Sequence, residues 1–121
     1  MTSEKLEVLL AQKEEVLTKI FDIALKQNSL IKNRSLSEIY GLDEQKGLFI
    51  KEMELIDLDI TAVKVIPQET GQNTKEKAKN INQIFDKLII IEKDNEHLLS
   101  KFMENYTAGF INAYEKMKER F

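Results

Sequence analysis

Residues 98–117 read LLSKFMENYTAGFINAYEKM and lie within a stretch that predicts one long helix. It contains four aromatic residues at intervals of four positions: Phe102, Tyr106, Phe110 and Tyr114. On an α-helix, side chains four positions apart lie one above another, so these rings form an aromatic ridge along one face. The ridge packs either against the rest of the chain or against another molecule, and the predicted function depends on which of these it contacts.

The remainder of the chain predicts the same type of secondary structure. Apolar residues recur at intervals of three and four, the period of an amphipathic helix, and each such row is here called an apolar seam. The predicted helices cover residues 3–32, 43–66 and 74–120, with a short turn of helix at about 35–40. The connections are short, so consecutive helices should be antiparallel. We therefore predict one all-α domain spanning residues 1–121, an antiparallel three-helix bundle or coiled coil with a long C-terminal helix.

The predicted helices differ in length. At about 1.5 Å per residue, the first helix spans ~45 Å, the second ~35 Å and the third ~70 Å. The third helix would then extend past its partners, leaving the aromatic ridge without cover from its own chain. Two alternatives would reduce this overhang. The first helix could continue through Tyr40. Alternatively, the chain could bend at Gly109 and fold its end back, since glycine within a helix is less favourable than alanine by roughly 1 kcal/mol.

Three polar residues occupy seam positions. Lys13 and Gln27 interrupt the seam of the first helix, where polar groups either fix the register or extend their polar ends to solvent. Asn95 occupies a seam position of the third helix. It either is buried and selects register or partner number, or lies in contact with water after a slight rotation of the helix.

Composition favours helix and excludes several classes of function. The chain has one proline, four glycines and a net charge of −3, with acidic and basic residues interspersed, so it offers no basic patch to a nucleic acid. The longest purely apolar stretch, Leu88–Ile91, is too short for a membrane span, and the amino terminus lacks a secretory signal. Cysteine is absent, which suits a reducing compartment, so we expect a soluble cytoplasmic protein.

No set of residues in the sequence predicts catalysis. His97 is the only histidine, and Asp94 three residues before it does not complete the ligand set that a metal site in a helical bundle needs. Glycine-rich phosphate loops are missing, and nearly all carboxylates fall on predicted polar faces. We predict that the protein is not an enzyme and needs no metal or other cofactor.

The candidate functional site is therefore a binding surface on the last helix. Methionine and tyrosine beside phenylalanine suit adaptable, partly hydrated surfaces, and such a face can receive an amphipathic helix of a protein partner. Packing within the protein's own core is the alternative. The candidate partner-binding residues are Leu98, Leu99, Phe102, Met103, Tyr106, Phe110, Tyr114 and Met117.

Four segments resemble a known family: LKQNSLIKN at 25–33, LSEI at 36–39, KGLFIKEMELIDLD at 46–59 and IIIEKDNEHLL at 89–99. They are similar to the bacterial flagellar export chaperones called FlgN and FliT, which are short, cysteine-poor helical proteins. The resemblance implies a cytosolic type III secretion chaperone that binds the helical C-terminal segment of a late flagellar subunit, a hook-associated or filament-cap protein. It further implies transfer of that subunit to the export apparatus, and it does not choose between the FlgN and FliT types.

Two other interpretations use the same apolar face. In a structural, self-associating coiled-coil protein, the ridge would pair with a second copy of the chain and give a homodimer. In a helical regulator, it would sequester a transcription or assembly factor. The three interpretations agree on a protein partner and differ in its identity.

Overall fold

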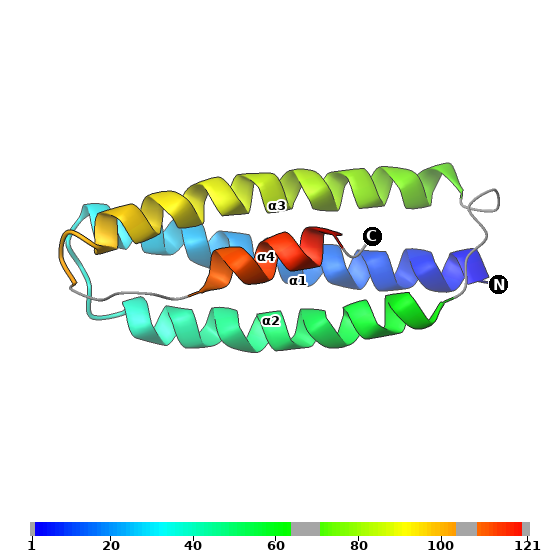
Figure 1. The fold of residues 1–121 in the computed structure, drawn as a ribbon, viewed down its shortest axis with the longest axis horizontal. Coiled ribbons are helices and arrows are strands. Elements are labelled where there is room, and N and C mark those ends of the chain that lie inside the picture. Colours follow the sequence, from blue (N-terminus) through cyan, green and yellow to red (C-terminus); the bar gives the residue numbers. More distant parts are fainter. Residues whose placement is uncertain (1, 64–70, 104–108, 120–121) are drawn as a thin grey trace.

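The computed structural model describes residues 2–63, 71–103 and 109–119, and every regular element in these residues is an α-helix. The helices are α1 (Thr2–Lys32), α2 (Ile39–Ala62), α3 (Gln72–Leu99) and α4 (Phe110–Glu119). Consecutive helices run in opposite directions, as the short connections predicted (Figure 1). The predicted all-α class is thereby confirmed.

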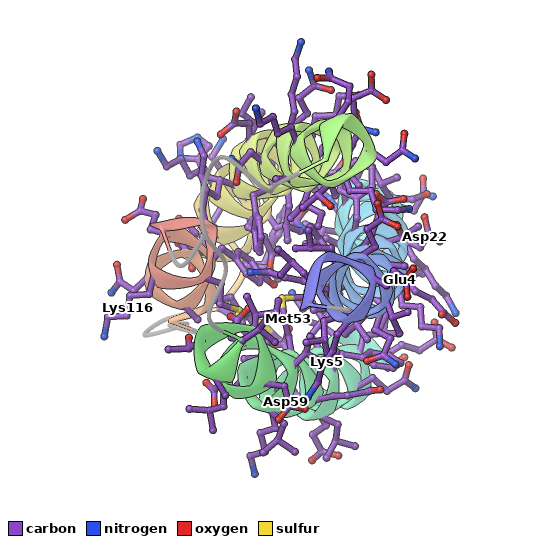
Figure 2. The ribbon with its side chains drawn as sticks, turned by 90° about the vertical axis from the view of Figure 1, so that its right-hand side faces the viewer. Glu4, Lys5, Asp22, Met53, Asp59 and Lys116 are labelled. Carbon is purple, nitrogen blue, oxygen red and sulfur yellow. The ribbon has the colours of Figure 1, made fainter. Side chains whose placement is uncertain are left out.

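The four helices surround one core. α1 packs against both α2 and α3, whereas α4 packs against α3 and, less extensively, against α2. In the end-on view, α4 lies on the side of the bundle opposite α1, and Met53 of α2 points toward the centre (Figure 2). Because α4 is only ten residues long, it covers part of the length of its neighbours (Figure 1). The described residues therefore form a bundle of three long helices completed by a short fourth.

The apolar seams of the sequence form the core. Residues at intervals of three and four lie on one face of each helix, and those faces meet in the middle of the bundle. The main core cluster consists of Leu6, Leu9, Leu10, Val16, Leu17, Ile20, Ala24, Ile50, Met53, Ile56, Ile60, Ile81, Phe85, Leu88, Tyr114 and Met117. A smaller cluster of Ile31, Ile39 and Leu99 closes the end of the bundle at which α1 and α3 end and α2 begins.

The prediction of one long C-terminal helix over residues 74–120 is wrong. α3 ends at Leu99, whose carbonyl accepts hydrogen bonds from the N–H groups of Phe102 and Met103 at 3.0 and 2.8 Å. Gly109 has a φ of 70°, in the left-handed region that glycine adopts at little cost, and α4 begins at the next residue. The chain folds back, as a bend at Gly109 would allow, and α4 buries apolar side chains that a continuous helix would expose.

The first connection also differs from the prediction. Arg34 has a φ of 58°, and the N–H of Ser35 donates to the carbonyl of Leu30 at 2.8 Å, an arrangement typical of the Schellman motif that ends a helix. α2 then begins at Ile39 rather than at residue 43, so the last two residues of the short turn predicted at 35–40 belong to α2. The final positions predicted for this helix, 64–66, lie outside the described residues.

Candidate functional site

The candidate binding residues do not form one exposed ridge. Three of them are buried: Leu99 in the smaller core cluster, and Tyr114 and Met117 of α4 in the main core. Phe110 is half-buried against the main core, and its ring stacks on that of Tyr114 with the centroids 6.3 Å apart. The expectation that this face lacks cover within its own chain is wrong for these residues, because α4 folds back onto α2 and α3.

The remaining candidates lie near the C-terminal end of α3. Leu98 and Met103 are half-buried against the smaller core cluster. Phe102 is exposed, and the Arg34 guanidinium carbon lies 5.5 Å from the centroid of its ring. Tyr106 lies outside the described residues. The structure thus divides the described candidates into a group on α4 and a group at this end of α3.

Tyr114 joins α4 to a buried ion pair. Its hydroxyl donates a hydrogen bond to Glu92 Oε2 of α3 at 2.8 Å. Lys46 of α2 donates to the same carboxylate, from Nζ to Oε1 at 3.0 Å and to Oε2 at 2.8 Å. All three side chains are buried. One carboxylate therefore links α2, α3 and α4.

The ammonium group of Lys46 has further favourable contacts. Its Nζ lies 4.2 Å from the centroid of the Phe110 ring, a cation–π contact, and 3.4 Å from Asp43 Oδ1. Gln27 of α1 donates a hydrogen bond to the same Asp43 oxygen at 2.7 Å. A charge is tolerated inside a protein when it is paired and hydrogen-bonded, and Lys46 satisfies both conditions.

A second buried ion pair contacts α4 nearer its C-terminal end. Lys13 Nζ of α1 lies 2.7 Å from Asp57 Oδ1 of α2 and donates to the backbone carbonyl of Met117 at 3.2 Å. The last carbonyls of a helix have no partner within the helix, and the negative end of the helix dipole attracts a cation. Lys13 therefore donates a hydrogen bond to one of these carbonyls and also places a positive charge near the C-terminal end of α4. At the surface, Lys118 of α4 pairs with Asp86 of α3.

Asn95 is buried between α1 and α3. Its side-chain amide donates to the carbonyl of Ala24 at 3.1 Å and to Glu92 Oε1 at 3.3 Å, and its side-chain oxygen accepts a bond from Asn28 at 2.8 Å. Burial with defined partners favours the interpretation in which Asn95 fixes the register of the helices. His97, two residues later on α3, is exposed.

Glu96 lies beside this polar network. Partial burial raises the pKa of its carboxyl group, the negative charge of Glu92 raises that pKa further, and the positive charge of Lys46 lowers it. The folded chain therefore holds a proton on Glu96 to a higher pH than the unfolded chain does. By linkage, ionisation of Glu96 as the pH rises through this interval lowers the stability of the fold.

Sequence reasoning missed three of the four buried charges that surround α4. It identified Lys13 as a seam residue, but it did not identify Lys46, Asp57 or Glu92, and it assigned nearly all carboxylates to polar faces. The available signal was spacing, because Lys46 follows Leu42 by four residues as a seam residue does. A search for charged residues at seam positions would have identified the buried ion pairs around α4.

The packing of α4 is less complete toward α2 than toward α3. A pocket of about 310 Å³ lies between α2 and the region of α4. Its lining residues are Glu54, Gly109, Asn112, Ala113, Lys116 and Met117. α4 is therefore anchored on the side of α3 and on the buried charges, and it leaves space on the side of α2.

Within the ranges that the structure describes, no three histidine, aspartate or glutamate side chains are grouped in a way that would hold a metal ion. Of the helices in the described part of the chain, none combines the length and the apolar character needed to cross a bilayer.

The fold and the site define a helical bundle whose short last helix is held by buried ion pairs as well as by apolar contacts. A scan against models of known protein families gave no match to the chain, and comparisons with curated proteins and with solved structures gave none either. The resemblance to the FlgN and FliT chaperones stays a prediction from the sequence.

Proposed function

We propose that the protein is a cytosolic helix-binding chaperone of flagellar type III secretion, and that a helix of its partner takes the position that α4 occupies. The partner is a late flagellar subunit, a hook-associated or filament-cap protein, bound through its helical C-terminal segment. The flagellar assignment rests on the sequence resemblance. The helix-binding assignment rests on the way in which α4 is held.

The observation that carries the proposal is that α4 binds the rest of the bundle as a separate short helix. Ten residues are too few to form a stable helix alone in water, so α4 depends on the surface that α2 and α3 provide. Tyr114 and Met117 point into that surface and Glu115 is exposed, as in an amphipathic helix that enters a groove. The bundle therefore has a surface that accepts one short amphipathic helix.

The contacts beneath α4 define what a partner helix has to supply. Glu92 accepts a hydrogen bond from Tyr114, and Lys13 donates one to the carbonyl of Met117. A replacing helix needs a hydroxyl or amide donor near Glu92 and the carbonyls of a helix end near Lys13. A buried polar group left without its hydrogen bond costs about 1–3 kcal/mol, so these two requirements give selectivity.

The candidate residues of the last helix take different roles in this proposal. Phe110, Tyr114 and Met117 belong to the internal occupant of the site, which a partner helix displaces. Leu98, Phe102 and Met103 lie outside α4, at the end of α3, and are the candidates for direct contact with the partner.

The test weakens α4 without changing the surface beneath it. The double variant Tyr114→Ala, Met117→Ala removes the two most buried side chains of α4 and leaves α1, α2 and α3 unchanged. The substitutions weaken the contacts of α4, so in a larger fraction of molecules α4 has left its position on α2 and α3. The affinity for the partner segment should therefore increase about tenfold or more. Isothermal titration calorimetry with the C-terminal segments of the hook-associated and filament-cap subunits of the same genome measures it.

A matched control lies on the exposed side of the same helix. Glu115→Ala should leave the affinity unchanged, since Glu115 is exposed and does not line the pocket beside α4. If neither the wild type nor any variant binds any of these segments, the chaperone assignment is contradicted. If the Tyr114 and Met117 variant instead binds more weakly, the partner does not take the position of α4. The side chains of α4 would then contact the partner directly.

A further inference from the structure

The outer face of α2 carries an apolar seam that no part of the bundle buries. Tyr40, Leu48, Leu55 and Leu58 each expose between 61% and 67% of their surface, and they are half of the large apolar side chains that are exposed in the described residues. The seam continues through two charged residues at the same helical spacing. We call this row the outer seam, and it consists of Tyr40, Glu44, Leu48, Lys51, Leu55 and Leu58.

The outer seam is aligned as a helix partner requires. Leu48 and Leu55 lie seven residues apart, which is about two turns, and Leu58 lies close to one turn further on. The three leucines therefore follow one side of α2 over ~15 Å. Single exposed apolar residues are common on soluble proteins, whereas an aligned row of leucines on one helix face is typical of a surface that binds another helix.

α2 also carries all of the charge imbalance among the four helices. It contains six acidic and two basic residues, whereas acidic and basic residues are equal in number in each of α1, α3 and α4. One basic and one acidic residue of α2, Lys46 and Asp57, are buried in ion pairs. The exposed charges of α2 are those of Glu44, Lys51, Glu52, Glu54 and Asp59, four acidic and one basic. Each of the four acidic residues lies four positions from a leucine of the row, so on the helix the carboxylates border the leucines.

From the leucine row and its acidic border, we propose that the outer seam binds an amphipathic helix of a partner protein whose apolar row is flanked by lysine and arginine. The leucines provide apolar area for burial, and the carboxylates attract the basic flanks and exclude acidic ones.

The same charges disfavour the other two occupants of an exposed apolar seam. A second copy of this chain would bring two acidic borders together, which is repulsive. An anionic membrane surface attracts basic residues and would repel these carboxylates. The outer seam contains no residue of α4 and lies on a different face of α2, so this inference does not depend on the function proposed above.

The probe is a fluorescein-labelled synthetic peptide of about 20 residues, long enough to form a helix, with leucines at intervals of three and four and lysines beside them. Titration of the full chain, followed by fluorescence anisotropy, should give saturable binding that weakens as salt is added. Leu55→Ser together with Leu58→Ser should weaken binding about tenfold or more, because both side chains would lie at the centre of the contact.

Ile90→Ser is the matched control, since Ile90 of α3 exposes 67% of its surface and does not belong to the outer seam. It should leave the affinity unchanged, and circular dichroism checks that both variants keep their helix content. Equal binding by wild type and by the Leu55 and Leu58 variant overturns the site. A peptide of the same pattern with glutamate in place of lysine should not bind, and equal binding of the two peptides overturns the charge argument.

Two further measurements address the other occupants. Light scattering should give a monomer, and vesicles of phosphatidylcholine and phosphatidylglycerol should not retain the protein on sedimentation. A dimer that the Leu55 and Leu58 substitutions abolish would overturn the proposal in favour of a second copy. Vesicle binding that the same substitutions abolish would overturn it in favour of a membrane.

Discussion

Glu92 is the residue on which the position of α4 depends most directly. It accepts hydrogen bonds from Lys46 and from Tyr114, and all of these groups are out of contact with water. Removing an ion from water costs several kcal/mol, which the attraction between the charges and the added hydrogen bonds offset. Such a pair contributes little net stability, but a structure that leaves one member alone is strongly disfavoured. The pair therefore determines where α4 lies more than how stable the bundle is.

Replacing one member of the Lys46–Glu92 pair should destabilise the protein more than replacing both. Glu92→Met leaves the Lys46 ammonium buried with Asp43 as a remaining acidic neighbour at 3.4 Å, and should lower the free energy of unfolding by about 3 kcal/mol or more. The double variant Lys46→Met, Glu92→Met buries two apolar side chains and should be more stable than Glu92→Met alone. Urea unfolding measures both.

The exposed pair of Glu15 with Lys19, 3.7 Å apart, provides the control. Glu15→Met should change the free energy of unfolding by less than about 1 kcal/mol, because exposed ion pairs contribute little. A double variant less stable than Glu92→Met would contradict this account of the buried pair.

Spacing in the sequence predicted burial better than it predicted partners. Lys13, Gln27 and Asn95 were recognised as seam residues, and all three are buried. The pairing of Lys13 with Asp57 was not recognised. It depends on the rotation and axial position of α1 relative to α2, and spacing within one helix reports neither.

At the level of elements, α3 and α4 share one uninterrupted apolar pattern. The intervals of three and four continue through Leu99, Gly109 and Phe110, so one long helix and two antiparallel helices have the same signature. The difference between them lies in tertiary packing, because folding back buries Tyr114 and Met117 in a core that the rest of the chain forms. The sequence identified Gly109 as the weak point of the helix but did not predict its left-handed backbone.

Alanine substitutions at two glycines should have effects of opposite sign. Gly109→Ala places a side chain at a φ of 70° and should lower the free energy of unfolding by about 1 kcal/mol. Gly41 lies within α2, and a Cβ added there has no heavy atom within 4 Å, so Gly41→Ala should raise the free energy of unfolding by about 0.5–1 kcal/mol. Urea unfolding compares the two variants with wild type, and stabilisation by both substitutions would contradict the left-handed turn before α4.

At the scale of the whole molecule, α2 separates two surfaces of different character. Its inner face contributes to the core and to the buried charges that hold α4, whereas its outer face presents leucines bordered by carboxylates. The proposals attach one partner helix to each surface. They use different residues and different variants, so either can fail without the other.

The last helix returns to the bundle and places Phe110 and Tyr114 beside Lys46 and Glu92. Nuclear Overhauser effects in an isotope-labelled sample test this placement most directly, because they arise only between protons in close contact. With Lys46 Nζ 4.2 Å from the centroid of the Phe110 ring, we predict cross-peaks between the ring protons of Phe110 and the ε-methylene of Lys46. Absence of these cross-peaks, together with helical carbon chemical shifts that continue through Gly109, would show that α4 does not fold back onto α2 and α3.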